Sequence, residues 1–245
     1  SRGLVACEEV TKLDPEFHVG IGNWVSLLRG AAYAKLVRGE PFDLQPALAQ
    51  LDHADQVKSG DSYLLATRVD ILLPQARFAH ARHGDPLPLL ERAEQVATQL
   101  RTLYPSHAAG YVGLVDVLHQ KMKLARSTVQ EADVRQLLTL CNERLREMPQ
   151  DISLRMAKVD ALLSLALIRG PASSEQGIRE AVALLRSLAG SLSHRADYHA
   201  LMARALRLYA QTHASGAQRA QTESQAERNE ALRIHPLLPK DELEP

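Results

Sequence analysis

Three aspartates recur at nearly equal intervals along the chain, each in the same local sequence. Asp70, Asp116 and Asp160 each follow a valine and precede apolar residues, at separations of 46 and 44 residues (70 to 116, 116 to 160). Paired carboxylates perform general acid and base chemistry only when they converge on one bond. If each aspartate lies on its own helix, neighbouring carboxylates stand about 10 Å apart, a typical distance between packed helices. This separation argues against catalysis, and we expect no enzymatic activity from this chain.

Other reactive residue types lack the spacing that their chemistry needs. His80 and His83 lie three residues apart but have neither a third ligand nor an HExxH pattern, so we expect no metal site. The two cysteines, Cys7 and Cys141, form no CxxC or Cys/His motif, and Cys141 falls on an apolar stripe that predicts burial. Gly20-Ile21-Gly22 lacks a preceding strand, which excludes a phosphate loop. We expect no cofactor.

The aspartates belong to a repeat of about 44 residues. Steps of 44 residues back from Val69 and forward from Val159 reach further copies, so the chain holds five. Alignment of the copies gives three apolar columns: Val25, Val69, Val115, Val159 and Ala203; Leu28, Leu72, Leu118, Leu162 and Leu206; and Ala32, Ala76, Met122, Ala166 and Ala210. Spacing of three and four places these columns on one face of a helix and predicts that they form the core.

The elements that carry these columns read as pairs of helices. Helical periodicity with Gly and Pro punctuation predicts helices over 4–13, 20–38, 43–58, 63–83, 89–104, 108–125, 131–148, 152–169, 175–192, 195–213 and 217–234. The predicted fold is all-α: an α-α superhelix, or solenoid, of about five helical hairpins. Residues 1–19 read as the second helix of a truncated preceding repeat, 20–238 as the solenoid and 239–245 as a loose tail. Gly110 and Gly113 predict close helix contact at the start of the third hairpin.

A polar column accompanies the apolar ones and supplies the candidate binding residues. It consists of Ser26, Asp70, Asp116, Asp160 and Arg204, with Arg77 and Lys123 seven residues after Asp70 and Asp116. In one interpretation the aspartates pair locally, with Arg68, Lys158 or a base of a neighbouring repeat. In the other, the column lines a charged groove that binds a peptide of mixed charge. The candidate partner-binding residues are then Asp70, Asp116, Asp160, Arg77, Lys123 and Arg204.

Composition narrows the classes of partner. Lys and Arg total 29 and Asp and Glu also total 29, so the chain lacks the basic field that nucleic-acid binding needs. No apolar run approaches the roughly 18 residues of a transmembrane helix, and we expect no membrane partner. Two isolated cysteines suit a reducing compartment, so we expect a cytoplasmic location. Because Ser1 is not a methionine and no signal peptide follows, we expect the chain to be a piece of a larger protein.

The hairpin signature resembles that of tetratricopeptide repeats. Trp24-x-x-Leu27-Leu28 with Tyr33, and the closing triplets Leu13-Asp14-Pro15, Leu103-Tyr104-Pro105 and Ile234-His235-Pro236, are similar to parts of that motif. The interval departs from the family, because a tetratricopeptide repeat has about 34 residues. Gly39-Glu40-Pro41, Gly84-Asp85-Pro86 and Ala231-Leu232-x-x-His235-Pro236-Leu237-Leu238 resemble the C-terminal repeat regions of some bacterial serine/threonine protein kinases.

The resemblance implies a non-catalytic module that binds a protein or peptide, in the regulatory region of a kinase whose catalytic domain lies upstream in the same chain. No HRD, DFG or glycine-rich kinase motif occurs in these 245 residues. The alternative is a self-association module that forms a homo-oligomer, either through its N-terminal end or along its convex side, with Leu4, Val5 and Val10 covered by another copy. A third function, small-ligand binding between hairpins, is not required by any motif.

Overall fold

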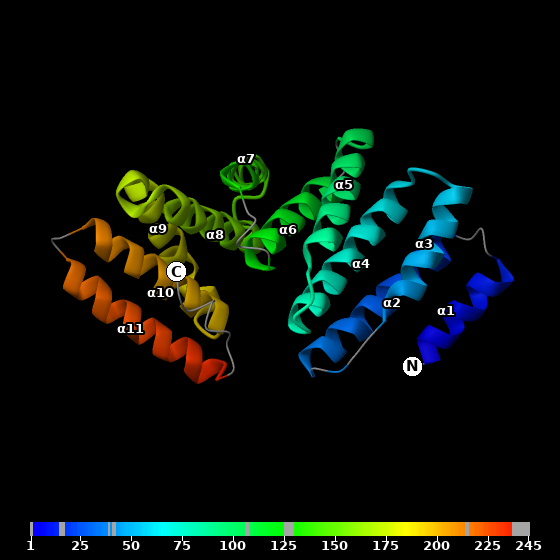
Figure 1. Ribbon diagram of the computed structural model, residues 1–245, viewed down its shortest axis with the longest axis horizontal. Helices are drawn as coiled ribbons and strands as arrows, with labels where there is room; N and C mark the ends of the chain where they lie inside the picture. The colour runs from blue at the N-terminus through cyan, green and yellow to red at the C-terminus, as the bar shows by residue number, and fades with distance from the viewer. Residues whose placement is uncertain are drawn as a thin grey trace. The chain divides into compact units, whose positions relative to one another are not determined.

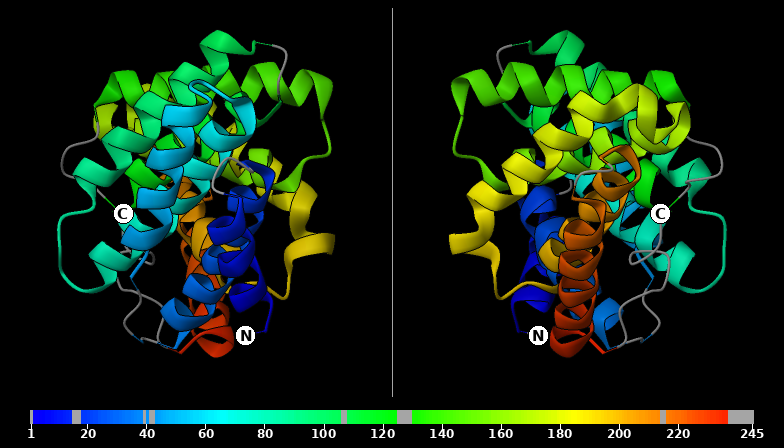
Figure 2. Two further views of the ribbon diagram at one scale, coloured as in Figure 1. Left: turned by 90° about the vertical axis from the view of Figure 1, so that its right-hand side faces the viewer. Right: turned by 90° about the vertical axis from the view of Figure 1, so that its left-hand side faces the viewer.

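The described part of the chain is built of α-helices (Figures 1 and 2). The computed structural model describes residues 2–14, 18–38, 40, 43–105, 108–124, 130–213 and 216–236. Within those ranges there are eleven α-helices and one short 3-10 helix, and no strand. The chain divides into two compact units, residues 1–128 and 129–245. The all-α class is thus confirmed, while the tail expected at 239–245 lies outside the described residues.

Unit 1 holds six helices: α1 (Arg2–Leu13), α2 (His18–Val37), α3 (Gln45–Val57), α4 (Ser62–Ala81), α5 (Leu87–Leu103) and α6 (Ala108–Leu124). Helix α4 packs against α2 on one side and α6 on the other, so these three first helices of successive hairpins lie side by side (Figure 1). Helices α3 and α5 pack against them. The Asp61 carboxylate caps the N-terminus of α4 by accepting hydrogen bonds from the backbone N–H groups of Tyr63 and Leu64 at 2.9 and 3.2 Å.

Unit 2 holds five α-helices: α7 (Glu131–Glu147), α8 (Ile152–Arg169), α9 (Glu175–Leu192), α10 (Ala196–Thr212) and α11 (Ala217–Ile234), with a 3-10 turn, η2 (Pro171–Ser174), before α9. Each of them packs against the next one in the chain, and α8 also packs against α10. Asp151 caps α8 by accepting a hydrogen bond from the backbone N–H of Leu154 at 2.9 Å. The boundary between the units falls between α6 and α7, which the sequence pairs as the third hairpin.

The three apolar columns form the core, as their periodicity predicts. Every member of the Val/Ala column and of the Ala/Met column is buried. In the leucine column Leu72, Leu118, Leu162 and Leu206 are buried, whereas Leu28 of α2 is only half-buried. The first helices of both units therefore bury the same apolar face. Burial of this face is the main source of stability for amphipathic helices that pack together.

Gly110 and Gly113, for which the sequence predicts close helix contact, lie where α6 meets its neighbours. A Cβ added at Gly110 would lie 3.0 Å from both the backbone N and the Cα of Arg101 in α5. At Gly113 the nearest atom would be Cγ1 of Val69, at an ordinary 3.5 Å. The small residue is thus needed most at Gly110, where one helix approaches the backbone of another.

Candidate functional site

The first helices of unit 1 carry the accessible part of the polar column. Asp70 of α4 and Asp116 of α6 are exposed, and Arg77 and Lys123, two turns further along the same helices, are half-buried. We call these four side chains the polar face. It combines two carboxylates and two bases on adjacent helices, so it presents both signs of charge to a partner.

Hydrogen bonds between neighbouring helices fix two of these side chains. Arg29 of α2 forms an ion pair with Asp70, and Nε of Arg77 donates to Oε1 of Gln120 in α6 at 2.9 Å. Partial burial raises the pKa of Asp70, and the Arg29 guanidinium opposes this effect without cancelling it. These two side chains are thereby held in place before any partner arrives, which reduces the entropy lost on binding.

Unit 2 places the other two candidates in the interior. Asp160 of α8 and Arg204 of α10 are 3% and 4% exposed, and their Oδ1 and Nη1 atoms are 2.9 Å apart. Nη2 of Arg204 also donates to Oγ of Ser164 at 3.3 Å. A partner has no access to these side chains in this arrangement, so we remove both from the candidate binding residues. Their role is to join two successive hairpins.

Two of the bases that the sequence offers as local partners for the aspartates pair with other carboxylates. Arg68 pairs with Asp52 of α3, and Lys158 pairs with Glu180 of α9 at 2.6 Å. Asp70 and Asp160 are instead bound by bases from the first helix of an adjacent hairpin. The sequence allowed Arg68, Lys158 or a base of a neighbouring repeat as partners. Asp70 and Asp160 both pair with a base of a neighbouring repeat.

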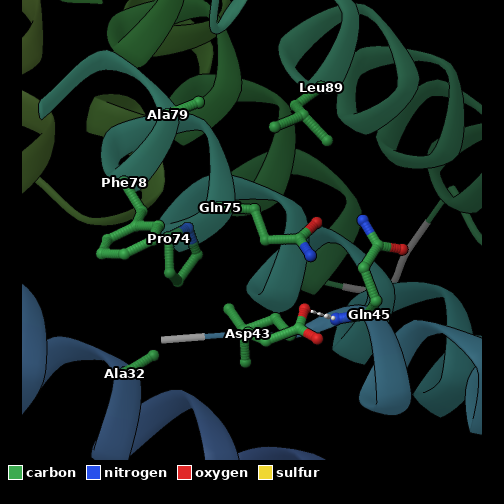
Figure 3. Close-up of a pocket in the computed structure, with 9 residues that line it drawn as sticks. Ala32, Asp43, Gln45, Pro74, Gln75, Phe78, Ala79 and Leu89 are labelled. Atoms are coloured by element: carbon green, nitrogen blue, oxygen red, sulfur yellow. Dashed lines mark hydrogen bonds between the residues drawn. The ribbon is translucent and has the colours of Figure 1, made fainter. Parts of the chain in front are cut away.

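A pocket of about 190 Å³ opens in unit 1 beside the C-terminal halves of α2 and α4 (Figure 3). Its apolar walls come from four elements: Ala32 of α2, Leu44 before α3, Pro74, Phe78 and Ala79 of α4, and Leu89 of α5. Three polar residues complete the lining: Asp43, Gln45 and Gln75. An apolar hollow with a few convergent polar groups is the usual form of a ligand site.

The polar end of this pocket contains an acceptor that the described part of the chain leaves unsatisfied. Oε1 of Gln75 is buried and has no hydrogen-bond partner among the residues that the structure describes. In Figure 3 the side-chain amides of Gln75 and Gln45 point toward each other, with the Asp43 carboxylate below them in the view. Oδ1 of Asp43 accepts a hydrogen bond from the backbone N–H of Gln45 at 2.9 Å. This arrangement can receive a hydrogen-bond donor.

The remaining reactive residues occupy separate places. Among the side chains that the structure describes, no group of three or more His, Cys, Asp or Glu is arranged to hold a metal ion. Cys141 is fully buried, and burial raises the pKa of its thiol to about 12, whereas Cys7 is half-buried. Gly22 lies inside α2 against the ring of Tyr63, where a Cβ would come within 1.9 Å of Cε1. Gly22 thus takes part in the packing of α2 against α4.

Neither a model of a known protein family nor a curated protein matches the chain. None of the helices in the described ranges has the length and the apolar character needed to span a membrane. Function must therefore be inferred from the chain's own side chains. Sequence reasoning missed Gln75 and Asp43, because neither belongs to the repeat columns and their pocket exists only once four segments have packed together.

Proposed function

We propose that the chain is a non-catalytic scaffold that binds an extended or helical peptide segment along the polar face, within a tetratricopeptide-like superhelix of hairpins. The observation that supports this proposal is the side-by-side packing of α2, α4 and α6, with Asp70 and Asp116 exposed on adjacent helices. Repeat proteins use such rows of first helices as extended binding surfaces.

The charges of the face define the partner that fits it. Two carboxylates and two bases favour a segment that carries both signs of charge, because like charges placed opposite one another are costly. Exposed ion pairs add little affinity individually, since each contributes about 0–1 kcal/mol. The face is therefore suited to selecting a partner by charge pattern and to binding that weakens as salt is added.

Selection from a displayed random-peptide library tests the proposal directly. The wild-type chain is expected to enrich peptides of mixed charge, and Asp116→Lys and Lys123→Glu should each invert the charge preferred at one peptide position. Glu91→Lys provides the matched control, because Glu91 is an exposed carboxylate on the second helix α5. No enrichment, or the same enriched sequences from all four proteins, would remove the proposal.

We also propose that this scaffold serves as the regulatory or interaction region of a bacterial serine/threonine kinase in the cytoplasm. The support is the resemblance of its hairpin turns to those kinase repeat regions. The reading frame that encodes the chain provides the test, because a kinase domain is expected upstream of Ser1. A full reading frame without one would end this part of the proposal and leave peptide binding intact.

Self-association is the second candidate, and exposed apolar residues on α1 favour it. Val5, Val10 and Leu13 are 61%, 40% and 85% exposed, a concentration of large apolar side chains on one short helix. Covering them with a second copy would bury this surface. Light scattering should then show concentration-dependent dimers that Val5→Glu abolishes. A monomer across the concentration range contradicts this alternative.

A further inference from the structure

The pocket of Figure 3, which we call the Gln75 pocket, has a carboxylate in its lining. Among the described residues that line it, Asp43 is the single one with an ionisable side chain. Arg82 lies over the Phe78 ring with Cζ 5.6 Å from the ring centroid, and it is not among the described lining residues. A charged ligand in this pocket is therefore favoured if it is a cation.

The two polar groups at this end of the pocket, the Gln75 side-chain carbonyl and the Asp43 carboxylate, are both hydrogen-bond acceptors. Among the residues that the structure describes, Oε1 of Gln75 is buried without a hydrogen-bond partner, and Oδ1 of Asp43 accepts a hydrogen bond from the Gln45 backbone N–H. A buried carbonyl without a donor is costly, so a ligand that brings an N–H group gains free energy by satisfying it. The ligand must thus donate hydrogen bonds as well as carry positive charge.

The volume of the pocket limits the ligand to the size of one side chain. About 190 Å³ is below the roughly 300 Å³ at which sites for whole drug-sized ligands begin. Counted at about 30 Å³ per water molecule, it has room for about six water-sized groups. A four-carbon chain that ends in an ammonium group matches this size, and its apolar stem suits walls such as Pro74, Phe78 and Leu89.

We propose that the Gln75 pocket binds an ammonium group carried on a short aliphatic chain, with the ammonium at Asp43 and Gln75 and the chain against the apolar walls. The ligand is either the lysine side chain of a bound peptide or a free alkylamine. In the first case the site rests on the proposed peptide binding and names one residue of the peptide. In the second it is independent of the polar face.

The start of α3 does not reverse this charge preference. A helix N-terminus attracts anions, but Asp43 is already bound there to the backbone N–H of Gln45. Asp85 occupies the same position before α5, where its Oδ1 accepts a hydrogen bond from the Leu87 backbone at 2.9 Å, and it does not line the pocket. Asp85 is therefore a matched control for the charge of Asp43.

Titration of the full chain with n-butylammonium, followed by backbone amide NMR, tests the chemistry. We expect saturable shifts at Gln45, Gln75 and Ala79, with a millimolar Kd, and at least tenfold weaker binding of n-butanol and of butyrate. Equal binding of the cation and the uncharged alcohol overturns the proposal, and so does the absence of saturable shifts.

Two substitutions locate the binding groups without removing the local structure. Asp43→Asn keeps an acceptor for the Gln45 N–H but removes the charge, and Gln75→Met keeps the size but removes the buried oxygen. Each should weaken n-butylammonium binding at least tenfold, while Asp85→Asn leaves the Kd unchanged. Gln75→Met should also raise the thermal midpoint, so its loss of binding is separable from unfolding. An unchanged Kd in Asp43→Asn overturns the proposal.

A blocked Gly-Lys-Gly peptide and its Nε-acetylated form distinguish the two sources of the ammonium group. If the lysine peptide binds at least as tightly as n-butylammonium and acetylation abolishes binding, the ligand is a lysine side chain. If only the free amine binds, the ligand is an alkylamine. The library selection at the polar face contains no alkylamine, so failure there and failure of this titration are separate results.

Discussion

The imidazole of His199 in α10 is fixed between two acceptors, Oε2 of Glu227 in α11 at 2.5 Å from Nδ1 and the Ser193 carbonyl at 2.9 Å from Nε2. Both ring nitrogens donate only in the protonated imidazolium. Burial lowers the pKa of His199, but the bonds to Glu227 and Ser193 outweigh it and raise the pKa above its ordinary value of about 6.5. The charged form thus links the last two helices.

This link predicts that unit 2 loses stability as the pH rises. The contribution of His199 is fully present below about pH 6.5 and disappears as the pH passes through the raised folded-state pKa. A hydrogen bond to a charged group contributes about 1.5–3 kcal/mol, which sets the scale of the loss. Protection factors for hydrogen exchange in α11, compared at pH 6 and pH 9, measure it. His199→Gln should abolish the pH dependence, and His194→Gln, at an exposed position, should preserve it.

The buried pair in unit 2 predicts a strongly non-additive mutant cycle. Arg204→Met or Asp160→Leu alone leaves an uncompensated buried charge and should destabilise unit 2 by about 3–5 kcal/mol. The double variant removes both charges and should lie within about 1 kcal/mol of wild type, because buried ion pairs are commonly replaceable by apolar residues. Hydrogen exchange in α8 and α10 reports the three values. Additive losses would show that the two charges do not depend on each other.

Two glycines in first helices predict opposite responses to the same substitution. Gly110→Ala forces a Cβ to within 3.0 Å of the Arg101 backbone, so overpacking of about 1–3 kcal/mol should exceed the gain in helix propensity. Gly30→Ala meets nothing within 4 Å and should stabilise unit 1 by about 1 kcal/mol. Urea unfolding followed by fluorescence of Trp24, the single tryptophan, measures both. Equal effects would contradict the close approach of α5 and α6.

The two cysteines should differ sharply in thiol reactivity. Cys141 is 0% exposed with a pKa raised to about 12, so the reactive thiolate is scarce and inaccessible at neutral pH. Cys7 is half-buried on α1. A thiol reagent should therefore label one cysteine per chain in the native protein and two in guanidinium chloride. Rapid native labelling at Cys141 would show that α7 opens readily.

The repeat pattern predicts the helices and the core because both depend on periodicity alone. Helix α8 spans Ile152–Arg169 as expected, and the apolar columns are buried along both units. Leu28 departs from its column by being half-buried in α2. The aligned columns show which residues share a helix face. The burial of each residue depends on which elements pack beside it.

The polar residues were predicted less well for a physical reason. Asp70, Asp116 and Asp160 look alike in sequence, yet only Asp160 faces a guanidinium from the adjacent first helix in a buried setting. Local sequence does not specify which charge is placed opposite. The sequence did not point to Gln75, because what distinguishes this residue is a buried side-chain oxygen without a hydrogen-bond donor among the described residues. That property can be seen only in the folded structure.

At one aligned position the fourth hairpin carries an acid and the fifth carries a base. This difference fixes the order of these two hairpins. Asp160 and Arg204 are separated by one repeat, so the fourth hairpin requires a successor that carries a cation at that site. A gene in which the fourth hairpin was duplicated in tandem would place one buried carboxylate against another. Lengthening this array by simple copying is therefore disfavoured at that junction, even though its apolar surfaces would still match.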